Sequence, residues 1–178
     1  MKNVTTACNI VLTGFISTGK SSVARKLGER LGRRVVEVDD MIVEAAGKSR
    51  KEIFEEGGEE MFRNIEAAQV EKASRMENVV ISCGGGVVLR RENVDQLRSN
   101  GRIVLLTASP ETVASRTRHQ RRTILRDFSD VEAVRGMMAE REPYYRSAAD
   151  ITVETDGKTI DMIVNDIIYQ LDGLLNCT

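Results

Sequence analysis

The segment from Gly14 to Ser21 constrains the fold of this chain more than any other part of the sequence. Its residues are GFISTGKS, which match the pattern G-x-x-x-x-G-K-[ST]. The glycines allow a tight turn that points successive backbone N–H groups at one anion, and a helix that begins at the end of the loop adds its dipole. An apolar run precedes the loop, and a pattern with Val23, Leu27 and Leu31 on one helical face follows it. The segment predicts a strand, a phosphate-binding loop and a helix; the alternative interpretation is a glycine-rich turn without a ligand.

Two side chains of this loop have predicted roles in binding a nucleoside triphosphate. Lys20 is expected to reach the β- and γ-phosphates, and the hydroxyl of Ser21 is expected to ligate Mg²⁺, the predicted cofactor. The sequence has no NKxD motif for recognising guanine, so the expected nucleotide is ATP. The residues predicted to surround its phosphates are Gly14, Ser17, Thr18, Gly19, Lys20, Ser21 and Ser22.

Short apolar runs alternate with helical patterns through the rest of the chain. Runs suited to buried parallel strands cover residues 9–13, 34–38, 79–83, 103–107 and 150–153. Alternation of this kind requires crossover connections and predicts an α/β sandwich. Because no repeat and no Pro/Gly-rich linker interrupts the pattern, residues 1–178 are expected to form one domain.

Charge, hydrophobicity and cysteine content limit the binding partners and the cellular compartment that we expect for this chain. The formal net charge of −1 provides no overall attraction for nucleic acid or for an anionic membrane. No stretch is long and apolar enough to span a bilayer, and the N-terminal run is typical of a strand rather than of a signal peptide. Three widely spaced cysteines, Cys8, Cys83 and Cys177, support neither a disulfide framework nor a zinc site. We therefore expect a cytoplasmic monomer that binds ATP and a small molecule, without a nucleic-acid or membrane partner.

Three carboxylates, at Glu37, Asp39 and Asp40, lie at the end of the second apolar run. In open α/β sheets, ligands bind at the carboxyl ends of the strands. Alternation along a strand would place Glu37 and Asp39 on the same face, towards Mg²⁺ and the hydroxyl of a second substrate. In the alternative interpretation, Asp39 or Asp40 only caps the next helix.

Glycines and arginines further along the chain indicate where a second substrate would bind. Three consecutive glycines at 84–86 would let a substrate lie against the backbone, unless they form only a flexible turn. Arg63 lies in a helical pattern after a predicted break at Gly57-Gly58. Arg63 and Arg141 would suit bidentate capture of a carboxylate or phosphate, although each could be a solvated surface charge. The arginine-rich segment 116–128 is long for a loop inside a compact domain, which is typical of functional or mobile segments.

In these motifs the chain resembles the shikimate kinases. The resemblance covers nearly the whole sequence, through GFISTGKSS, VEVDDMI, IFEEGGEEMFRNIE, SCGGGVV, the arginine-rich segment, AEREPYY and VETDGKT. It implies a P-loop fold like that of the nucleoside monophosphate kinases, a three-layer α/β sandwich with a five-stranded parallel sheet. It also implies a mobile lid at approximately 116–128 and a substrate-binding segment at approximately 39–66. The implied reaction, a step of aromatic amino-acid biosynthesis, converts ATP and shikimate to ADP and shikimate 3-phosphate.

The same resemblance assigns roles to single residues. Asp39 corresponds to the aspartate that binds the substrate hydroxyls and serves as base or orienter. Arg122 corresponds to a lid arginine that contacts phosphate, with Arg121 as the alternative, so the implied catalytic residues are Lys20, Asp39 and Arg122. The implied adenine-side residues are Arg116, Asp156 and Lys158. The implied substrate pocket consists of Asp39, Arg63, Gly84, Gly85, Gly86 and Arg141, in which the two arginines hold the substrate carboxylate.

Three segments depart from the family pattern. In the phosphate loop, Phe15-Ile16-Ser17-Thr18 replace a smaller, Met/Gly/Ala-rich spacer. Glu37 stands where family members usually have an aspartate, so its contact with Mg²⁺ is expected to pass through water. The residues after Arg122 are Thr-Ile-Leu, where the lid commonly has Pro-Leu-Leu.

Two other functions remain open from the sequence. One is a related kinase with a gluconate-like or nucleotide acceptor, and the other is a regulatory module that binds ATP without transferring phosphate. Because such a module needs no carboxylate on the acceptor side, the presence of both Lys20 and Asp39 argues against it.

Overall fold

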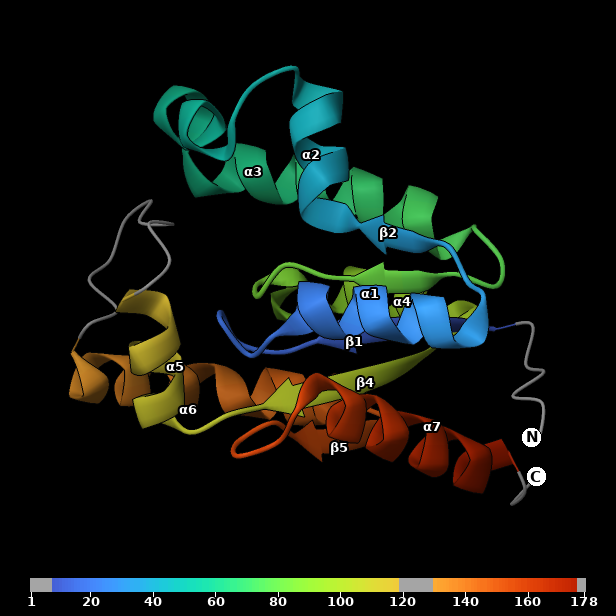
Figure 1. Cartoon of the computed structure of the whole chain (residues 1–178). Helices are drawn as coiled ribbons and strands as arrows, with labels where there is room; N and C mark the ends of the chain where they lie inside the picture. Colours follow the sequence, from blue (N-terminus) through green and yellow to red (C-terminus); the bar gives the residue numbers. More distant parts are fainter. Residues whose placement is uncertain (1–7, 119–129, 176–178) are drawn as a thin grey trace.

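In the computed structural model, which describes residues 8–118 and 130–175, five parallel strands form one sheet with helices on both faces (Figure 1). The strand order is β2-β3-β1-β4-β5. Each strand falls on an apolar run of the sequence, which confirms the predicted α/β sandwich and its five-stranded parallel sheet. The strands are β1 (Asn9–Thr13), β2 (Val35–Glu37), β3 (Val80–Ser82), β4 (Gly101–Thr107) and β5 (Ile151–Glu154).

The helices of the connections form the two outer layers. α1 (Lys20–Leu31) and α7 (Ile160–Leu175) pack together on one face of the sheet, in front of it in Figure 1. The other face is covered by η1 (Val87–Leu89), α4 (Arg91–Ser99) and α6 (Val131–Ala148). The remaining helices are α2 (Val38–Ala46), α3 (Arg50–Ser74) and α5 (Pro110–Arg118). Among the described residues, no helix combines the length and the hydrophobicity that a membrane span requires.

Side-chain alternation along the central strand divides the core into two clusters. Val11 belongs to the cluster that also contains Phe62 of α3 and Leu97 of α4, whereas Ile10 and Leu12 pack with α1 and α7. All residues of β1 are buried, as expected of a strand that is covered on both faces. The phosphate loop therefore starts from a fully buried strand at the centre of the sheet.

The long helix α3 contains the break predicted at its glycine pair. Ser49 and Glu52 form a capping box at its start, since each side chain accepts a hydrogen bond from the other residue's backbone N–H. Further on, Gly58 has φ 67° and ψ −164°, a conformation that side chains other than glycine rarely adopt. α2 and the first part of α3 stand together beyond β2, at the top of Figure 1.

The second strand is shorter than the alternation pattern predicted. β2 ends at Glu37 and α2 begins at Val38, so Asp39 lies in the first turn of a helix. The prediction that strand alternation places Glu37 and Asp39 on one face was therefore wrong. The alternative was also wrong, because the N-cap residue of α2 is Glu37 and no side chain makes a capping hydrogen bond. Asp39 and Asp40 lie instead in the first turn, where the helix dipole favours negative charge.

The packing of α7 can be tested at Ile167, which is fully buried against the sheet and α1. The change Ile167→Ala leaves a cavity and should lower the free energy of unfolding by about 2–5 kcal/mol. Met162 on the same helix is half-exposed, so Met162→Ala should change it by less than about 0.5 kcal/mol. Urea titrations followed by circular dichroism measure both values, and equal losses would contradict the assigned buried face of α7.

Candidate active site

The phosphate loop connects the end of β1 to the start of α1, and its geometry requires glycine at two positions. Gly14 has φ 145° and Gly19 has φ 94°, both in the region that side chains disfavour. A Cβ atom at Gly14 would lie 2.4 Å from the carbonyl oxygen of Leu106 on β4. Gly19 is the N-cap residue of α1, so the loop ends at a helix N-terminus, an arrangement that favours a bound phosphate.

Lys20 is the first residue of α1, and its ammonium group folds back onto the loop. Nζ donates to the carbonyl oxygens of Gly14 (2.9 Å) and Phe15 (2.7 Å). Burial lowers the pKa of Lys20 to about 8, while the nearby carboxylates of Asp39 and Glu37 act in the opposite direction. Lys20 therefore lies within electrostatic reach of both carboxylates that the sequence analysis directed towards Mg²⁺ and the second substrate.

Ser21 and Glu37 bring a hydroxyl and a carboxylate together beside the loop. Oγ of Ser21 donates to Oε2 of Glu37 at 3.2 Å. Hard oxygen ligands of this kind suit Mg²⁺, which usually retains several waters and binds through one or two protein groups plus substrate phosphates. In the part of the chain that the structure describes, no group of three or more His, Cys, Asp or Glu side chains could form an all-protein cage. The donor set fits a Mg²⁺ ion held by Ser21 with Glu37 beside it.

A cavity of about 270 Å³ adjoins the phosphate loop and contains two of the three predicted adenine-side residues. Nη1 of Arg116 donates to the carbonyl oxygen of Ser17 (3.2 Å) and to Oγ1 of Thr155 (3.3 Å). Lys158 forms an ion pair with Asp166 at 2.9 Å. The cavity is lined by Ser17, Thr18, Gly19, Ser22, Val23, Arg116, Lys158, Ile160 and Ile163.

The side chains of two other predicted residues, Asp156 and Thr18, form hydrogen bonds to the protein backbone. Asp156 does not line this cavity, and its Oδ2 accepts a hydrogen bond from the backbone N–H of Ser109 at 2.7 Å, just before α5. The hydroxyl of Thr18 is buried and donates to the carbonyl oxygen of Phe15 at 2.9 Å. A larger cavity of about 360 Å³ lies between β4 and α6, and of the predicted site residues that the structure describes only Thr18 lines it. These two side chains shape the loop and the start of α5.

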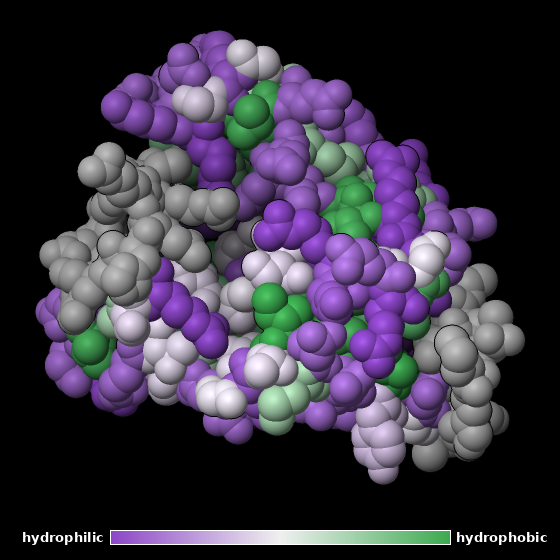
Figure 2. Space-filling model, viewed as in Figure 1, coloured by the Kyte–Doolittle hydropathy of each residue, from purple (hydrophilic) through white to green (hydrophobic). Residues whose placement is uncertain are grey.

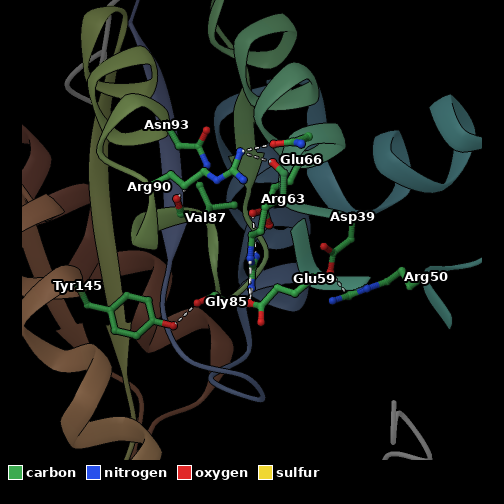
Figure 3. Close-up of polar contacts among 11 residues, drawn as sticks. Asp39, Arg50, Glu59, Arg63, Glu66, Gly85, Val87, Arg90, Asn93 and Tyr145 are labelled. Carbon is green, nitrogen blue, oxygen red and sulfur yellow. Dashed lines mark hydrogen bonds and ion pairs between the residues drawn. The ribbon is translucent and has the colours of Figure 1, made fainter. Parts of the chain in front are cut away.

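The two carboxylate oxygens of Asp39 differ in their surroundings, and only one of them has a hydrogen-bond partner among the described residues (Figure 3). Oδ2 accepts a hydrogen bond from Nη1 of Arg50 at 2.7 Å. Oδ1 is buried and has no hydrogen-bond partner among the described residues. A Cβ atom at Gly84 would lie 2.8 Å from this Oδ1, so only glycine leaves space in front of it. Leaving a buried acceptor without a hydrogen bond costs free energy. We therefore expect Oδ1 to accept a hydrogen bond from the hydroxyl of a ligand.

Arg63 lies against the glycine segment and is held by two glutamates. Its Nη1 contacts Oε2 of Glu66 at 2.8 Å, and its Nη2 contacts Oε1 of Glu59 at 3.2 Å. Glu66 is only 1% exposed, so this carboxylate holds the guanidinium from inside the protein. A Cβ atom at Gly86 would lie 2.2 Å from Nη1 of Arg63. The structure therefore places Arg63 against the three glycines at 84–86, which we call the glycine wall.

Arg141 reaches the same place from α6. Its guanidinium carbon lies 5.7 Å from the ring centroid of Phe15, so it borders the phosphate loop. One turn later on the helix, the hydroxyl of Tyr145 donates to the carbonyl oxygen of Gly85. Burial raises the pKa of Tyr145 to about 12, and the charges of Arg141 and Arg63 partly offset this rise. The two arginines that were predicted to hold a substrate carboxylate therefore both lie close enough to the hydroxyl of Tyr145 to affect its pKa.

The site lies at the carboxyl edge of the sheet, next to the segment formed by α2 and α3. Figure 2 shows a recess in the face of the molecule between this segment and the rest of the chain. Arg121 and Arg122 lie outside the described residues, so their predicted roles in a lid stay predictions.

Sequence reasoning missed three residues of the site: Arg50, Glu66 and Tyr145. The spacing of Glu66, three residues after Arg63 on one helix, could have indicated that pair. Arg50 falls inside the predicted substrate-binding segment at approximately 39–66, but it lies 11 residues from Asp39 and outside every motif, so nothing in the sequence indicated their contact.

Comparisons with known proteins point to one family. A family model described as shikimate kinase matches residues 16–172. A shikimate kinase of Caldanaerobacter subterraneus subsp. tengcongensis is 44% identical over 161 residues, which cover 90% of this chain and 94% of the relative. One from Geobacter metallireducens is 44% identical over 166 residues, with coverage of 93% and 92%. The solved structure of an Acinetobacter baumannii shikimate kinase in complex with shikimate matches with a TM-score of 0.88 at 29% identity, covering 94% of each chain.

The space in front of Asp39 can be tested with Gly84→Ala. The added methyl group would press on Oδ1 of Asp39, so catalytic efficiency toward the phosphate acceptor should fall by about 10- to 100-fold while ATP affinity stays unchanged. Gly136→Ala on α6 is the matched control, because a Cβ atom there meets nothing within 4 Å. Steady-state kinetics with ATP and acceptor varied separately measure the effect. Equal efficiency in the two variants would remove Gly84 from the acceptor pocket.

Lys20 gives the affinity for ATP a predicted pH dependence. Only the ammonium form pairs with phosphate, and bound phosphates raise the pKa of Lys20 above its value of about 8 in the free protein. Affinity should therefore weaken above pH 8 by up to about tenfold per pH unit, because binding then requires uptake of a proton. Isothermal titration calorimetry between about pH 7.5 and 9.5 measures this slope, with Lys20→Arg as a control that stays charged. A flat profile for the unaltered protein would contradict the prediction.

Proposed function

The chain belongs to the shikimate kinase family, and from this premise we propose that it transfers the γ-phosphate of ATP to the 3-hydroxyl of shikimate. One observation carries the proposal beyond family membership. The free oxygen of Asp39 and the ammonium group of Lys20 lie at the same edge of the sheet. Burial lowers the pKa of Lys20, and Asp39 is close enough to offset part of that fall. An acceptor group and a donor group within electrostatic reach of each other are what phosphoryl transfer requires.

The donor end is formed by the phosphate loop. Its backbone N–H groups and Lys20 bind the β- and γ-phosphates, and Arg116 with Lys158 lines the cavity where the adenine is bound. Bound Mg²⁺ would neutralise charge on the phosphates, with Ser21 as its direct ligand and Glu37 holding it through water.

The acceptor end is formed by two arginines and the glycine wall. Arg63 and Arg141 hold the carboxylate of shikimate, because a guanidinium offers the planar pair of donors that a carboxylate accepts. Gly84, with its neighbours at 85 and 86, lets the ring lie against the backbone. The hydroxyl to be phosphorylated donates to Oδ1 of Asp39, which has no other partner among the described residues.

The reaction moves one proton and one phosphoryl group. The hydroxyl oxygen of shikimate attacks the γ-phosphorus as its proton passes to the carboxylate of Asp39. The bond between the γ-phosphorus and the oxygen bridging it to the β-phosphate breaks, and ADP leaves with that electron pair. Lys20 stabilises the charge that develops on the phosphate oxygens. Arg122, from the predicted lid, would add a second cation when the lid closes.

An ADP-release assay against shikimate, gluconate and CMP tests the choice of acceptor. Turnover with shikimate alone is the expected result, because the paired arginines suit a carboxylate and the pocket beside Asp39 suits a hydroxyl. Turnover only with gluconate or only with CMP would replace the proposed acceptor by another. Tight ATP binding without turnover on any acceptor would favour a regulatory module instead.

The role of Asp39 can be separated from nucleotide binding with Asp39→Asn. The amide cannot take up the proton, so kcat should fall by about 100-fold or more, while affinity for ATP changes little. Asp40→Asn is a matched control on the next residue, whose side chain is exposed, and it should retain full kcat. Rapid-quench kinetics and ATP titrations measure the two effects. If ATP affinity collapsed instead, Asp39 would belong to the magnesium site and the assigned role would be wrong.

A further inference from the structure

We propose that Arg50 is a positioning residue that fixes the carboxylate of Asp39 for the acceptor, an inference that rests on the proposed function. Arg50 is the first residue of α3, and Asp39 lies in the first turn of α2. None of the motifs that carry the family resemblance includes Arg50. Its contact with Asp39 is therefore a feature that only the folded chain shows.

The hydrogen bond between these residues decides which oxygen of Asp39 faces the pocket. Nη1 of Arg50 holds Oδ2 at 2.7 Å, in a charge-assisted bond between groups that are each about one-third exposed. Oδ1 is left without a partner among the described residues and faces the space that Gly84 keeps open. With Oδ2 fixed by Arg50, rotation of the carboxylate would break this bond. The free oxygen is thus presented to the acceptor hydroxyl before the substrate arrives.

Arg50 is itself held in place from two directions. At the backbone, the capping box of Ser49 and Glu52 fixes the first turn of α3. At the other end of the side chain, the guanidinium carbon of Arg50 lies 5.2 Å from the ring centroid of Phe62. Phe62 is buried and stacks on Phe54, with the two ring centroids 4.8 Å apart. A long side chain that is fixed at both ends loses little further entropy when it orients its partner.

The charges around Asp39 explain why such a restraint matters. Burial lowers the pKa of Lys20 and raises the pKa of Glu66, and the carboxylate of Asp39 lies close enough to both groups to act on each pKa in the upward direction. Without Arg50, the ammonium group of Lys20 would be the competing partner for Asp39, and an ion pair between them would withdraw Lys20 from the phosphates. The bond from Arg50 to Asp39, drawn in Figure 3, keeps the acceptor carboxylate engaged. Arg50 thereby keeps Asp39 from pairing with Lys20.

Substitutions at position 50 test this role. Arg50→Gln removes the charge, and Arg50→Met also keeps an apolar contact with Phe62. In both, kcat should fall by about 10- to 100-fold, with the KM of shikimate and the affinity for ATP within about threefold of the unaltered protein. Arg50→Lys should recover most of kcat, because an ammonium group can still bond to Oδ2 although it lacks the planar fork. Lys51→Gln, at the exposed neighbouring residue, is the matched control and should leave all constants unchanged.

Each alternative outcome counts against the inference. Unchanged kcat in the Gln and Met variants would overturn it, and so would a raised KM for shikimate at unchanged kcat, which would make Arg50 a binding residue. Loss of kcat that follows a lowered melting temperature, without recovery in Arg50→Lys, would make Arg50 a structural residue. Absence of shikimate phosphorylation by the unaltered protein would overturn the proposed function together with this inference. Full activity in Arg50→Gln would overturn only the inference.

Discussion

The carboxyl ends of three parallel strands lie in one row, and the whole site depends on this constraint. Leu12 of β1 pairs in register with Ser82 of β3, and Ser82 pairs with Glu37 of β2. The chain therefore leaves the sheet three times at neighbouring points of one edge, into the phosphate loop, into the glycine segment and into α2. Because these exits are adjacent, groups that bind a donor phosphate and groups that bind an acceptor meet without long connecting loops.

Paired charges prepare this edge for two anionic substrates. Arg50 is paired with Asp39, Arg63 is paired with Glu66, and Lys20 lies within reach of the carboxylate of Asp39. The cations are therefore oriented before a substrate arrives, which lowers the reorganisation that binding and transfer require. A guanidinium has five N–H donors, so Arg63, in its proposed role, would donate to the carboxylate of shikimate without releasing Glu66.

The parts of this structure that the sequence predicted depend on local patterns. The phosphate loop, the five strands and the break near Gly58 follow from short motifs and from alternation, and all were confirmed. The environment of Asp39 was not predicted correctly, because a run of apolar residues does not show where β2 gives way to α2. The contact with Arg50 joins two helices through a long, flexible side chain, and no local pattern encodes that direction. Predicted roles for Arg121 and Arg122 fall outside the described residues.

The central claim is that the phosphoryl group leaves ATP for shikimate rather than for water. Phosphorus-31 NMR of the protein with ATP, Mg²⁺ and shikimate follows donor and product together. The account predicts that the γ-phosphate signal of ATP is replaced by one phosphomonoester signal, in step with the formation of ADP and without inorganic phosphate. Formation of ADP with inorganic phosphate alone, or an unchanged spectrum, would contradict it.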